Sequence, residues 1–519
     1  MDKIIEKVKN KLDGNSNHGM TANTAVPQLN APLDKKLVYK VRKQRGVNLG
    51  SWFSLESWLT GSLFQHAKDP KGSELDIVSG MNANDAKAML ENHWDNFIND
   101  GDWQWMAGHG INSVRIPIHY VHFLAGNPNV HGLLKGTEFE PYAAVYEGAW
   151  QRVVRAIQKA QQLNIGVLID LHGVPGGQNK DGHSGKSDGK VHLWHGIHAS
   201  SNRKLTIKIL VALASAIGGY ENVIGLELMN EPENSAALEG FYIDAIKAIR
   251  SEASPQGAEL PLYIGDGWDT SHYTGFVNKH NDAGNPLVVD HHFYRCFTHQ
   301  DHNTTASDHA NHLEPNGGKT AVWLKKMSDK ANGSIIVGEW SAALNPKSLH
   351  GHGNKQEAQR AYAYAEWQAF EHFTAGYYYW TLKKEGGPDP GWCLYTAMEQ
   401  GIMPPSLNPR QALRGGNASV QEMQSRADSV LEPIYERHVS HWDSMGGKFK
   451  HDNFVEGFKS SWSDSLAFLN HDSEIGLIPY LAKLRLAAFT NQVQDKNTAW
   501  EFEHGYVQGA MAFRESLMS

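Results

Sequence analysis

Short apolar runs that end in polar residues recur along most of the chain, and helical patterns alternate with them. Each run has the length and nearly continuous apolar character of a strand that is buried on both faces of a parallel sheet. Between the runs, apolar residues return every three or four positions, which is the spacing of an amphipathic helix. The eight predicted strands cover residues 45–50, 112–117, 165–171, 223–229, 262–265, 286–290, 334–338 and 376–380.

Alternating strands and helices are typical of a closed parallel barrel, although an open doubly wound sheet shows the same alternation. Nucleotide-binding open sheets carry a glycine-rich fingerprint, and no GxGxxG or P-loop motif follows any predicted strand. We therefore expect an α/β fold of the (β/α)8 class, the TIM barrel. The second strand is expected to stop at Pro117, because proline lacks an amide hydrogen. Pro232 should hold Glu231 in an extended backbone.

The pattern changes at both ends of the predicted barrel. Residues 1–44 read as an N-terminal extension, residues 45–410 as the catalytic barrel, and residues 411–519 as a helical C-terminal extension. Helical spacing covers 420–439, 453–468, 478–490 and 500–518 in this last part. Its aromatic stripes are more typical of packing than of ligand binding, so we expect the extension to pack on the barrel.

Composition narrows the classes of partner. A formal net charge of −8 and a pI of about 6.4 argue against nucleic-acid binding. The chain has no run of about 18 apolar residues, so no membrane span is expected. It contains 16 tryptophans, whose wide apolar faces suit the C–H faces of sugar rings, although most of them should be core residues.

The cysteine count bears on the cellular compartment. Cys296 and Cys393 are the two cysteines, too few for a disulfide framework, although one disulfide between them stays open. Residues 1–14 lack the apolar core of a secretory signal. These features together lead us to expect an intracellular, cytoplasmic protein.

No metal, cofactor or serine nucleophile is predicted. The sequence has no HExxH motif and no paired-cysteine spacing, and its GxSxG match at residues 185–189 lies inside a polar loop, not at the end of a predicted strand as a nucleophile elbow would. Six histidines nevertheless gather after the sixth predicted strand, and most such residues are surface or core side chains. They are His291, His292, His299, His302, His309 and His312.

Two glutamates stand where predicted strands end. Glu231 follows Asn230 and precedes a proline, and Glu339 lies between Gly338 and Trp340 at the seventh strand. Catalytic groups of barrels sit at the carboxyl ends of strands. Glycoside hydrolysis needs two such carboxyl groups, one as acid and one as base or nucleophile. A single glutamate would be read as a salt-bridge residue, but this pair predicts a glycosidase.

Other strand ends supply matching chemistry. Arg115 on the second strand is either a core ion-pair partner or the group that keeps a nucleophile ionised. His172, His292 and Tyr294 follow the third and sixth strands and could bind sugar hydroxyls or orient a carboxylate. Trp380 ends the eighth strand, where it either packs the barrel or forms a platform beneath the sugar.

Several of these segments resemble glycoside hydrolase family 5, and within it the fungal exo-β-1,3-glucanase branch. The resemblance runs in order over residues 45–405. The matching segments are Arg45–Trp52, Leu55-Glu56, Val114–Ile118, Asp170–Gly173, Pro175–Asn179, Leu228–Pro232, Asp290–Tyr294, Val337–Ser341 and Tyr379–Lys383.

The resemblance implies a retaining hydrolase without a cofactor, acting on a carbohydrate substrate. It implies Glu231 as acid/base, Glu339 as nucleophile, and Glu56 as a ligand of the glucose at the non-reducing end. The residues that it places around the sugar at the cleavage point are Arg115, His172, Asn230, His292, Tyr294 and Trp380.

The chain also departs from that branch at two positions. It has Ser51 where the branch usually has a glycine, and Ser57 where the branch usually has a proline. The helical extension and the absence of a signal peptide and disulfides suggest an intracellular relative. We expect an exo-acting enzyme that removes β-linked glucose, with β-1,3 linkage as the first hypothesis. A β-glucosidase for a small glucoside or glucolipid and a carbohydrate-binding pseudoenzyme are the alternatives, and the sequence does not predict the oligomeric state.

Overall fold

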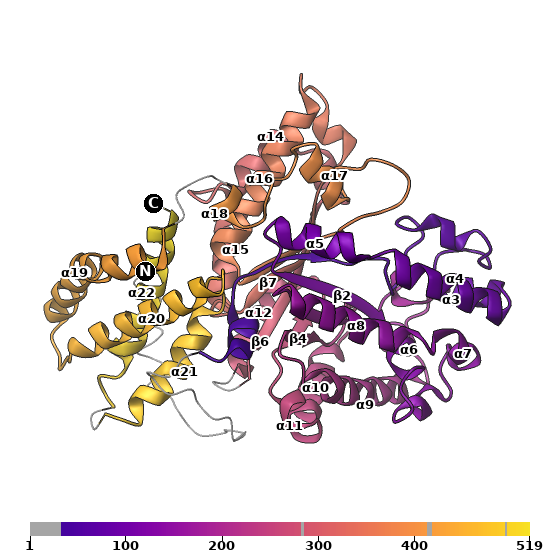
Figure 1. The fold of residues 1–519 in the computed structure, drawn as a ribbon, viewed down its shortest axis with the longest axis horizontal. Helices are drawn as coiled ribbons and strands as arrows, with labels where there is room; N and C mark the ends of the chain where they lie inside the picture. Colours follow the sequence, from indigo (N-terminus) through magenta and orange to yellow (C-terminus); the bar gives the residue numbers. More distant parts are fainter. Residues whose placement is uncertain (1–32, 282–284, 413–417, 494–495, 519) are drawn as a thin grey trace. The chain divides into compact units, whose positions relative to one another are not determined.

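The computed structural model describes residues 33–281, 285–412, 418–493 and 496–518 (Figure 1). It divides into two compact units. One comprises residues 44–281 and 285–412, and the other combines the described parts of 1–43 and 413–519. Most of the expected N-terminal extension, residues 1–32, lies outside the described residues.

The first unit is a closed barrel of eight parallel strands in chain order, as the alternating pattern predicted (Figure 1). β1 pairs with both β2 and β8, which closes the barrel. The strands are β1 (Gln44–Asn48), β2 (Ser113–His119), β3 (Gly166–Gly173), β4 (Val223–Glu227), β5 (Leu262–Gly265), β6 (Leu287–Arg295), β7 (Ile335–Leu344) and β8 (Gly376–Tyr379).

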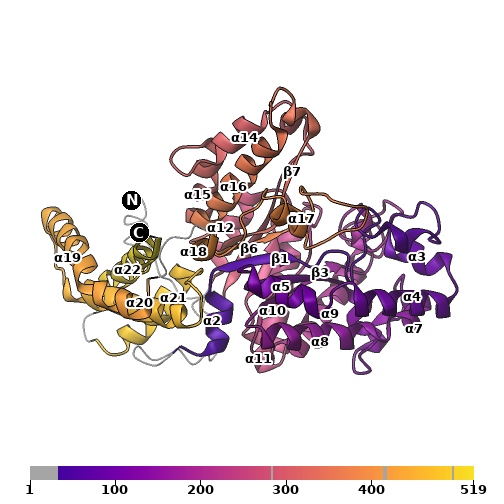
Figure 2. The same cartoon turned by 45° about the horizontal axis from the view of Figure 1, so that its top comes forward.

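Helices surround the strands, and α9, α10 and α11 pack side by side on one flank (Figure 2). The helices between successive strands are α3 (Glu74–Gly80), α4 (Ala83–Asn96), α5 (Asp100–Gly108), α6 (Tyr120–Leu124), α7 (Ala143–Tyr146), α8 (Ala149–Gln162), α9 (Ala199–Ile217), α10 (Leu238–Glu252), α11 (Pro255–Ala258), α12 (Thr270–His280), α13 (His299–His302), α14 (Ala306–Leu313), α15 (Lys319–Lys330) and α16 (Lys355–Phe373); α17 (Leu394–Glu399) and α18 (Pro409–Ala412) follow β8.

Proline does not stop the second strand, so that prediction is wrong. β2 continues through Pro117 to His119. The carbonyl of Pro117 faces the side of β1 and accepts a hydrogen bond from the backbone N–H of Ser54. Because β1 has already ended at Asn48, no residue of that strand lies opposite Pro117 to accept the hydrogen bond that its nitrogen cannot donate.

The second unit consists of helices. They are α2 (Lys35–Val41), α19 (Val420–Met445), α20 (Asp452–Asn470), α21 (Ile478–Thr490) and α22 (Trp500–Met518). The bounds of α21 and α22 equal those predicted from the spacing of apolar residues. Phe454, Phe458, Trp462 and Phe513 are buried in the core that α19, α20 and α22 share.

Glycines let α20 and α22 approach closely. A Cβ atom placed on Gly457 would lie 2.0 Å from the carbonyl oxygen of Phe502 on the facing helix. A Cβ on Gly505 would lie 2.0 Å from the carbonyl oxygen of Phe454. Both neighbours are backbone atoms, which cannot rotate away, so the packing of these helices depends on glycine at both positions.

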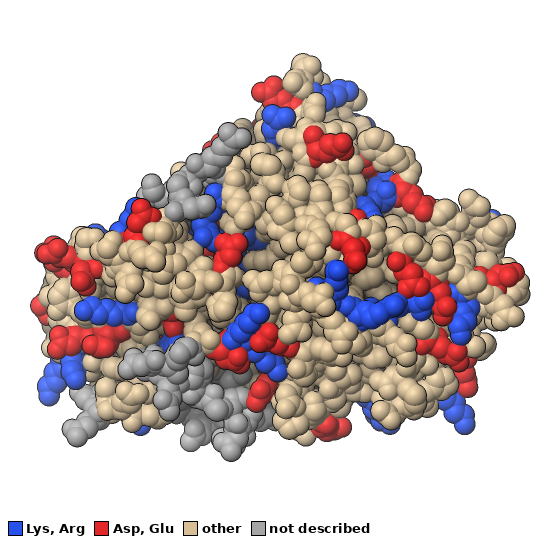
Figure 3. Space-filling model, viewed as in Figure 1, with Lys and Arg blue, Asp and Glu red and all other residues tan. Residues whose placement is uncertain are grey.

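The surface carries charges of both signs. On the face drawn in Figure 3, lysine and arginine side chains are interspersed with aspartate and glutamate. Among the described residues, no helix is long and apolar enough to cross a membrane.

The close approach of α20 and α22 can be tested with a matched pair of substitutions. Gly505→Ala should lower the free energy of unfolding by about 1–3 kcal/mol, because the new methyl group overlaps backbone. Gly240→Ala in α10 should leave stability unchanged or raise it by up to about 1 kcal/mol, since no atom lies within 4 Å of the added carbon. Denaturant unfolding measures both, and equal stability of the two variants would contradict the described packing.

Candidate active site

The two glutamates singled out by the sequence face each other at the carboxyl ends of the strands. Glu339 lies within β7, and Glu231 follows the end of β4. One carboxylate oxygen of each lies within 4.8 Å of the other, with a ring nitrogen of His292 in the same group. The parallel barrel thus brings together two residues that are 108 positions apart in the sequence.

The backbone at Glu231 is not extended, which corrects the prediction made from Pro232. β4 ends at Glu227, and Glu231 has a left-handed φ of +40°. The side-chain amide of Asn179 donates a hydrogen bond of 2.9 Å to the carbonyl oxygen of Glu231. This contact from the loop after β3 helps to hold a conformation that a non-glycine residue rarely adopts, and such positions cluster at functional sites.

Arg115 is fully buried at the centre of the site. Its Nη1 donates to Oε1 of Glu339 at 3.0 Å, and its Nη2 donates to Oδ1 of Asn230 at 2.8 Å. Its Nε donates to Oε2 of Glu227 at 2.7 Å, and Nη2 lies 3.1 Å from Oδ2 of Asp170. The guanidinium therefore touches the nucleophile candidate and the amide beside the acid candidate at the same time. These opposite charges raise its own pKa although burial opposes this.

Hydrogen bonds to Asp170 and Arg115 orient His172 and Asn230. Nδ1 of His172 lies 2.6 Å from Oδ2 of Asp170, and burial lowers the pKa of His172 well below its usual value. The neutral ring donates from Nδ1, so its Nε2 faces the amide of Asn230 at 3.4 Å as an acceptor. The ring of Trp380 is nearly parallel to that of His172, with centroids 5.9 Å apart.

His292 and Tyr294 contact the carboxylate pair from β6. Nδ1 of His292 donates to Oε1 of Glu231 at 2.7 Å and lies 3.4 Å from Oε2 of Glu339. The hydroxyl of Tyr294 donates to the same Glu339 oxygen at 2.8 Å. Burial opposes a charge on His292, but the negative charges of Glu339 and Asp290 raise its pKa well above the usual value.

The environments of the two glutamates separate their pKa values. Burial raises the pKa of Glu339 to about 7, against the opposing charges of His292 and Arg115. Burial also acts on Glu231, but the hydrogen bond and charge of His292 lower its pKa to about 2. These pKa directions favour a proton on Glu339, the reverse of the expected roles, but His292 contacts both carboxylates, so the three groups titrate together.

Glu56 contacts Trp58, which belongs to a group of aromatic side chains. Burial raises its pKa to about 7, and its Oε2 accepts a hydrogen bond of 2.8 Å from the indole of Trp58. The rings of Trp58 and Phe297 both lie near Trp392, with centroids 5.2 and 6.0 Å from it. The side chains of Trp58 and Phe297 are exposed. We call Trp58, Phe297 and Trp392 the aromatic rim.

Sequence reasoning missed three buried carboxyl groups around Arg115, those of Asp170, Glu227 and Asp290. Burial raises the pKa of Glu227 well above its usual value, although the charge of Arg115 opposes this. Burial also raises the pKa of Asp170, to about 6. Each of the three lies inside or at the end of an apolar strand. A carboxylate within such an apolar run is unusual, and this was the sequence feature that could have identified them.

His183 was also missed. Its Nε2 lies 3.5 Å from Oε2 of Glu231 and 3.0 Å from the amide nitrogen of Asn179. It comes from the polar loop after β3, where no strand end marks it. Its only sequence signal was its place in a long loop beside the predicted site.

Glu231, His292 and Glu339 have the right atom types and spacing for a metal ion. In the structure, however, His292 and Tyr294 donate protons to these carboxylates, and Arg115 neutralises Glu339. The oxygens of this pair are therefore engaged by hydrogen bonds and by the ion pair with Arg115.

Family models match both units of the chain. Residues 75–386 match the model described as Cellulase (glycosyl hydrolase family 5). Residues 423–517 match the model described as Glucan 1,3-beta-glucosidase 3 C-terminal domain. The helical extension is therefore similar to a domain with a family model of its own.

Relatives match over nearly the whole length. Glucan 1,3-beta-glucosidase 3 of Schizosaccharomyces pombe is 33% identical over 91% of this chain and 95% of its own. An uncharacterized glycosyl hydrolase of Saccharomyces cerevisiae is 30% identical over 99% of this chain and 100% of its own.

A solved structure agrees with the barrel. Rutinosidase from Aspergillus niger matches with a TM-score of 0.55 at 18% identity, over 70% of this chain and 98% of that one, which supports the fold alone. The family model covers more than half of the residues and includes both glutamates. The chain belongs to glycosyl hydrolase family 5.

Proposed function

We propose that this glycoside hydrolase releases glucose from the non-reducing end of β-1,3-linked glucans or oligosaccharides with retention of configuration. The observation that carries the proposal is the approach of Glu231 and Glu339, whose nearest oxygens lie within 4.8 Å. Retaining enzymes hold their carboxyl groups about 5–5.5 Å apart, whereas inverting enzymes leave about 6.5–9.5 Å for a water molecule.

In the first step, Glu339 attacks the anomeric carbon and Glu231 gives its proton to the leaving oxygen. The bond to the aglycone breaks as a glycosyl ester to Glu339 forms. In the second step, Glu231 takes a proton from water, whose oxygen attacks the anomeric carbon and frees Glu339. Arg115 and Tyr294 stabilise the charge that returns to Glu339.

His292 supplies the proton that makes Glu231 an acid. Its Nδ1–H lies 2.7 Å from Glu231, so one short transfer converts the ion pair into a neutral acid and a neutral imidazole. Substrate binding expels water and favours this neutral pair over two buried charges.

The remaining side chains fit a sugar at the cleavage point. Asn230 has its amide oxygen bound by Arg115, which leaves its NH2 group for His172 and a sugar hydroxyl. The exposed rings of the aromatic rim suit the C–H faces of further glucose units. In this proposal Glu56 binds hydroxyl groups of the terminal glucose, as the resemblance implies. The names of the fungal relatives, glucan 1,3-beta-glucosidases, favour the β-1,3 linkage.

Product analysis tests the substrate and the exo mode. Laminaripentaose should yield glucose and laminaritetraose at the earliest times, and the glucose should be released as the β anomer. A matched panel of a glucosyl lipid and an alkyl β-glucoside should be cleaved with a lower kcat/KM. Early release of internal oligosaccharides, α-glucose as the first product, or a preference for the glucosyl lipid would each contradict the proposal.

Alanine substitutions should separate the two glutamate roles. Glu339→Ala should lose hydrolysis of every β-glucoside, because no nucleophile remains. Glu231→Ala should lose about 10²–10⁴-fold in kcat on laminaribiose but retain glycosylation with 2,4-dinitrophenyl β-glucoside, whose leaving group needs no acid. Added azide should accelerate the Glu231 variant and give β-glucosyl azide, whereas any azide product of Glu339→Ala should be the α anomer, because a single displacement inverts the anomeric carbon. The opposite pattern would exchange the two roles, and normal turnover in both variants would exclude them.

Tyr294→Phe should change the pH dependence. The hydroxyl hydrogen bond stabilises ionised Glu339 and lowers its pKa, so its loss raises that pKa. The acid limb of the kcat/KM profile should therefore move to higher pH, and kcat/KM at its maximum should fall roughly 10- to 100-fold. Phe297→Ala, which leaves this hydrogen bond intact, is the control and should keep the acid limb in place. An unmoved limb in Tyr294→Phe would show that this contact does not tune the nucleophile.

A further inference from the structure

The helical unit contains a histidine and carboxylate cluster that the barrel chemistry does not use. His438 comes from α19, His451 precedes α20, and Glu501 lies in α22. Nε2 of His438 lies 3.1 Å from Oε2 of Glu501, and Nδ1 of His451 lies 2.9 Å from the same oxygen. All three side-chain atoms lie within 4.8 Å of one another.

In each of the three residues, the side-chain atom that faces away from the other two, here called the outer atom, already has a partner. The atoms that face one another are called the inner atoms. Nε2 of His451 lies 3.1 Å from Oδ1 of Asp443, and Nδ1 of His438 lies 3.2 Å from Nδ1 of His504. The backbone N–H of Lys450 donates to Oε1 of Glu501 at 2.6 Å. Oxygen and nitrogen partners on the far side of metal-bound histidines are the usual means of fixing their tautomer.

The hydrogen-bonding partners of His451 bear on whether a proton or a metal ion lies between the inner atoms. Both of its ring nitrogens face carboxylates, of Asp443 and Glu501, and a carboxylate only accepts hydrogen bonds. The contacts are satisfied either by a proton on each ring nitrogen or by a metal ion on the nitrogen that faces Glu501 and a proton on the one that faces Asp443. In the second case the N–H that donates to Asp443 orients the metal-bound ring.

Aromatic packing holds both histidine rings in place. The ring of His438 stacks on Phe454 with centroids 4.1 Å apart and planes 22° apart. The ring of His451 stacks on Phe449 at 5.6 Å and 16°. His438 and Glu501 are buried, and His451 is partly exposed, so a path to solvent exists at one ligand.

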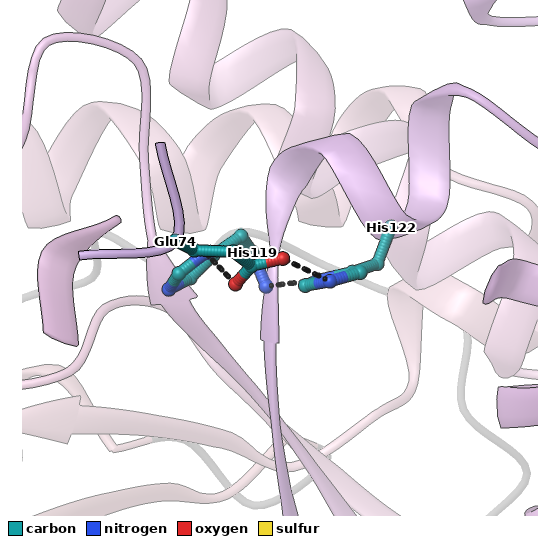
Figure 4. A group of neighbouring side chains, drawn as sticks. All are labelled: Glu74, His119 and His122. Atoms are coloured by element: carbon teal, nitrogen blue, oxygen red, sulfur yellow. Dashed lines mark hydrogen bonds and ion pairs between the residues drawn. The ribbon is translucent and has the colours of Figure 1, made fainter. Parts of the chain in front are cut away.

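A second cluster, in the barrel unit, shows what a non-metal arrangement looks like. Glu74, His119 and His122 lie equally close together (Figure 4). There, Nδ1 of His122 accepts the backbone N–H of His119, so the neutral ring must carry its proton on Nε2, which donates to Glu74 at 2.9 Å. The inner nitrogen is thus occupied by a proton, and this cluster carries no metal inference.

We propose that His438, His451 and Glu501 bind a divalent transition-metal ion, with zinc as the expected ion. Two imidazoles and one carboxylate are a zinc ligand set, and water completes the four positions in such three-ligand sites. The ion displaces the proton from each inner nitrogen to solvent and joins α19, the segment before α20, and α22. Its role is structural, since the ligands belong to the helical unit.

Cobalt and zinc binding to the full-length protein test this site. Protein freed of metal with a chelator should bind one Co²⁺ and develop the visible absorption of a tetrahedral or five-coordinate ion, which Zn²⁺ should abolish. Zn²⁺ should also raise the melting temperature of the stripped protein. His451→Ala should weaken Co²⁺ affinity at least tenfold. Asp443→Asn, an exposed outer partner, should weaken it about tenfold without affecting folding.

Two controls make the result specific. His441→Ala removes an exposed histidine of α19 outside the cluster and should bind Co²⁺ as the wild type does. Glu339→Ala should also bind normally, which separates this site from the barrel carboxylates. Absence of a cobalt spectrum in the wild type, or equal affinity in wild type, His451→Ala and Asp443→Asn, would overturn the proposal. Loss of binding in Glu339→Ala alone would place the ion in the barrel and overturn it as well.

Discussion

The buried guanidinium of Arg115 is the interaction on which the catalytic end of the barrel depends. Four carboxyl groups, from β3, β4, β6 and β7, lie within 3.8 Å of it. Such groups repel one another strongly when water is excluded, and one central cation makes their burial possible. Because Arg115 also binds Glu339 and Asn230, the charge that permits this acidic interior also positions the side chains of these two residues.

The single positive charge of Arg115 does not neutralise four carboxyl groups. The excess negative charge raises the pKa values of neighbouring groups. Burial raises the pKa of Glu227, which favours its protonated form. At the mouth, His292 becomes the second cation, with contacts to Glu231, Glu339 and Asp290. The raised pKa of His292 is thus a consequence of the acidity of the barrel interior, and this histidine contacts both Glu231 and Glu339.

Patterns that repeat along the chain predicted the fold, and strand ends predicted much of the site. Eight apolar runs suffice for the barrel, and parallel strands bring their carboxyl ends together, which is why Glu231, Glu339 and Arg115 could be grouped. The left-handed backbone of Glu231 could not be predicted, since a hydrogen bond from a distant loop favours it. Glu227 was read as part of an apolar run, because its partner Arg115 is 112 positions away.

Histidines show most clearly what spacing in a sequence leaves out. The six that gather after the sixth strand suggested and then failed to support a metal motif, whereas His438, His451 and Glu501 have no recognisable spacing. What distinguishes a proton site from a metal site is the group facing the outer nitrogen. A backbone N–H at His122 forces the proton inward, whereas the outer nitrogen of His451 faces a carboxylate, which leaves its inner nitrogen able to bind either a proton or a metal ion. That distinction exists only in three dimensions, and it makes two clusters of the same residue types chemically different.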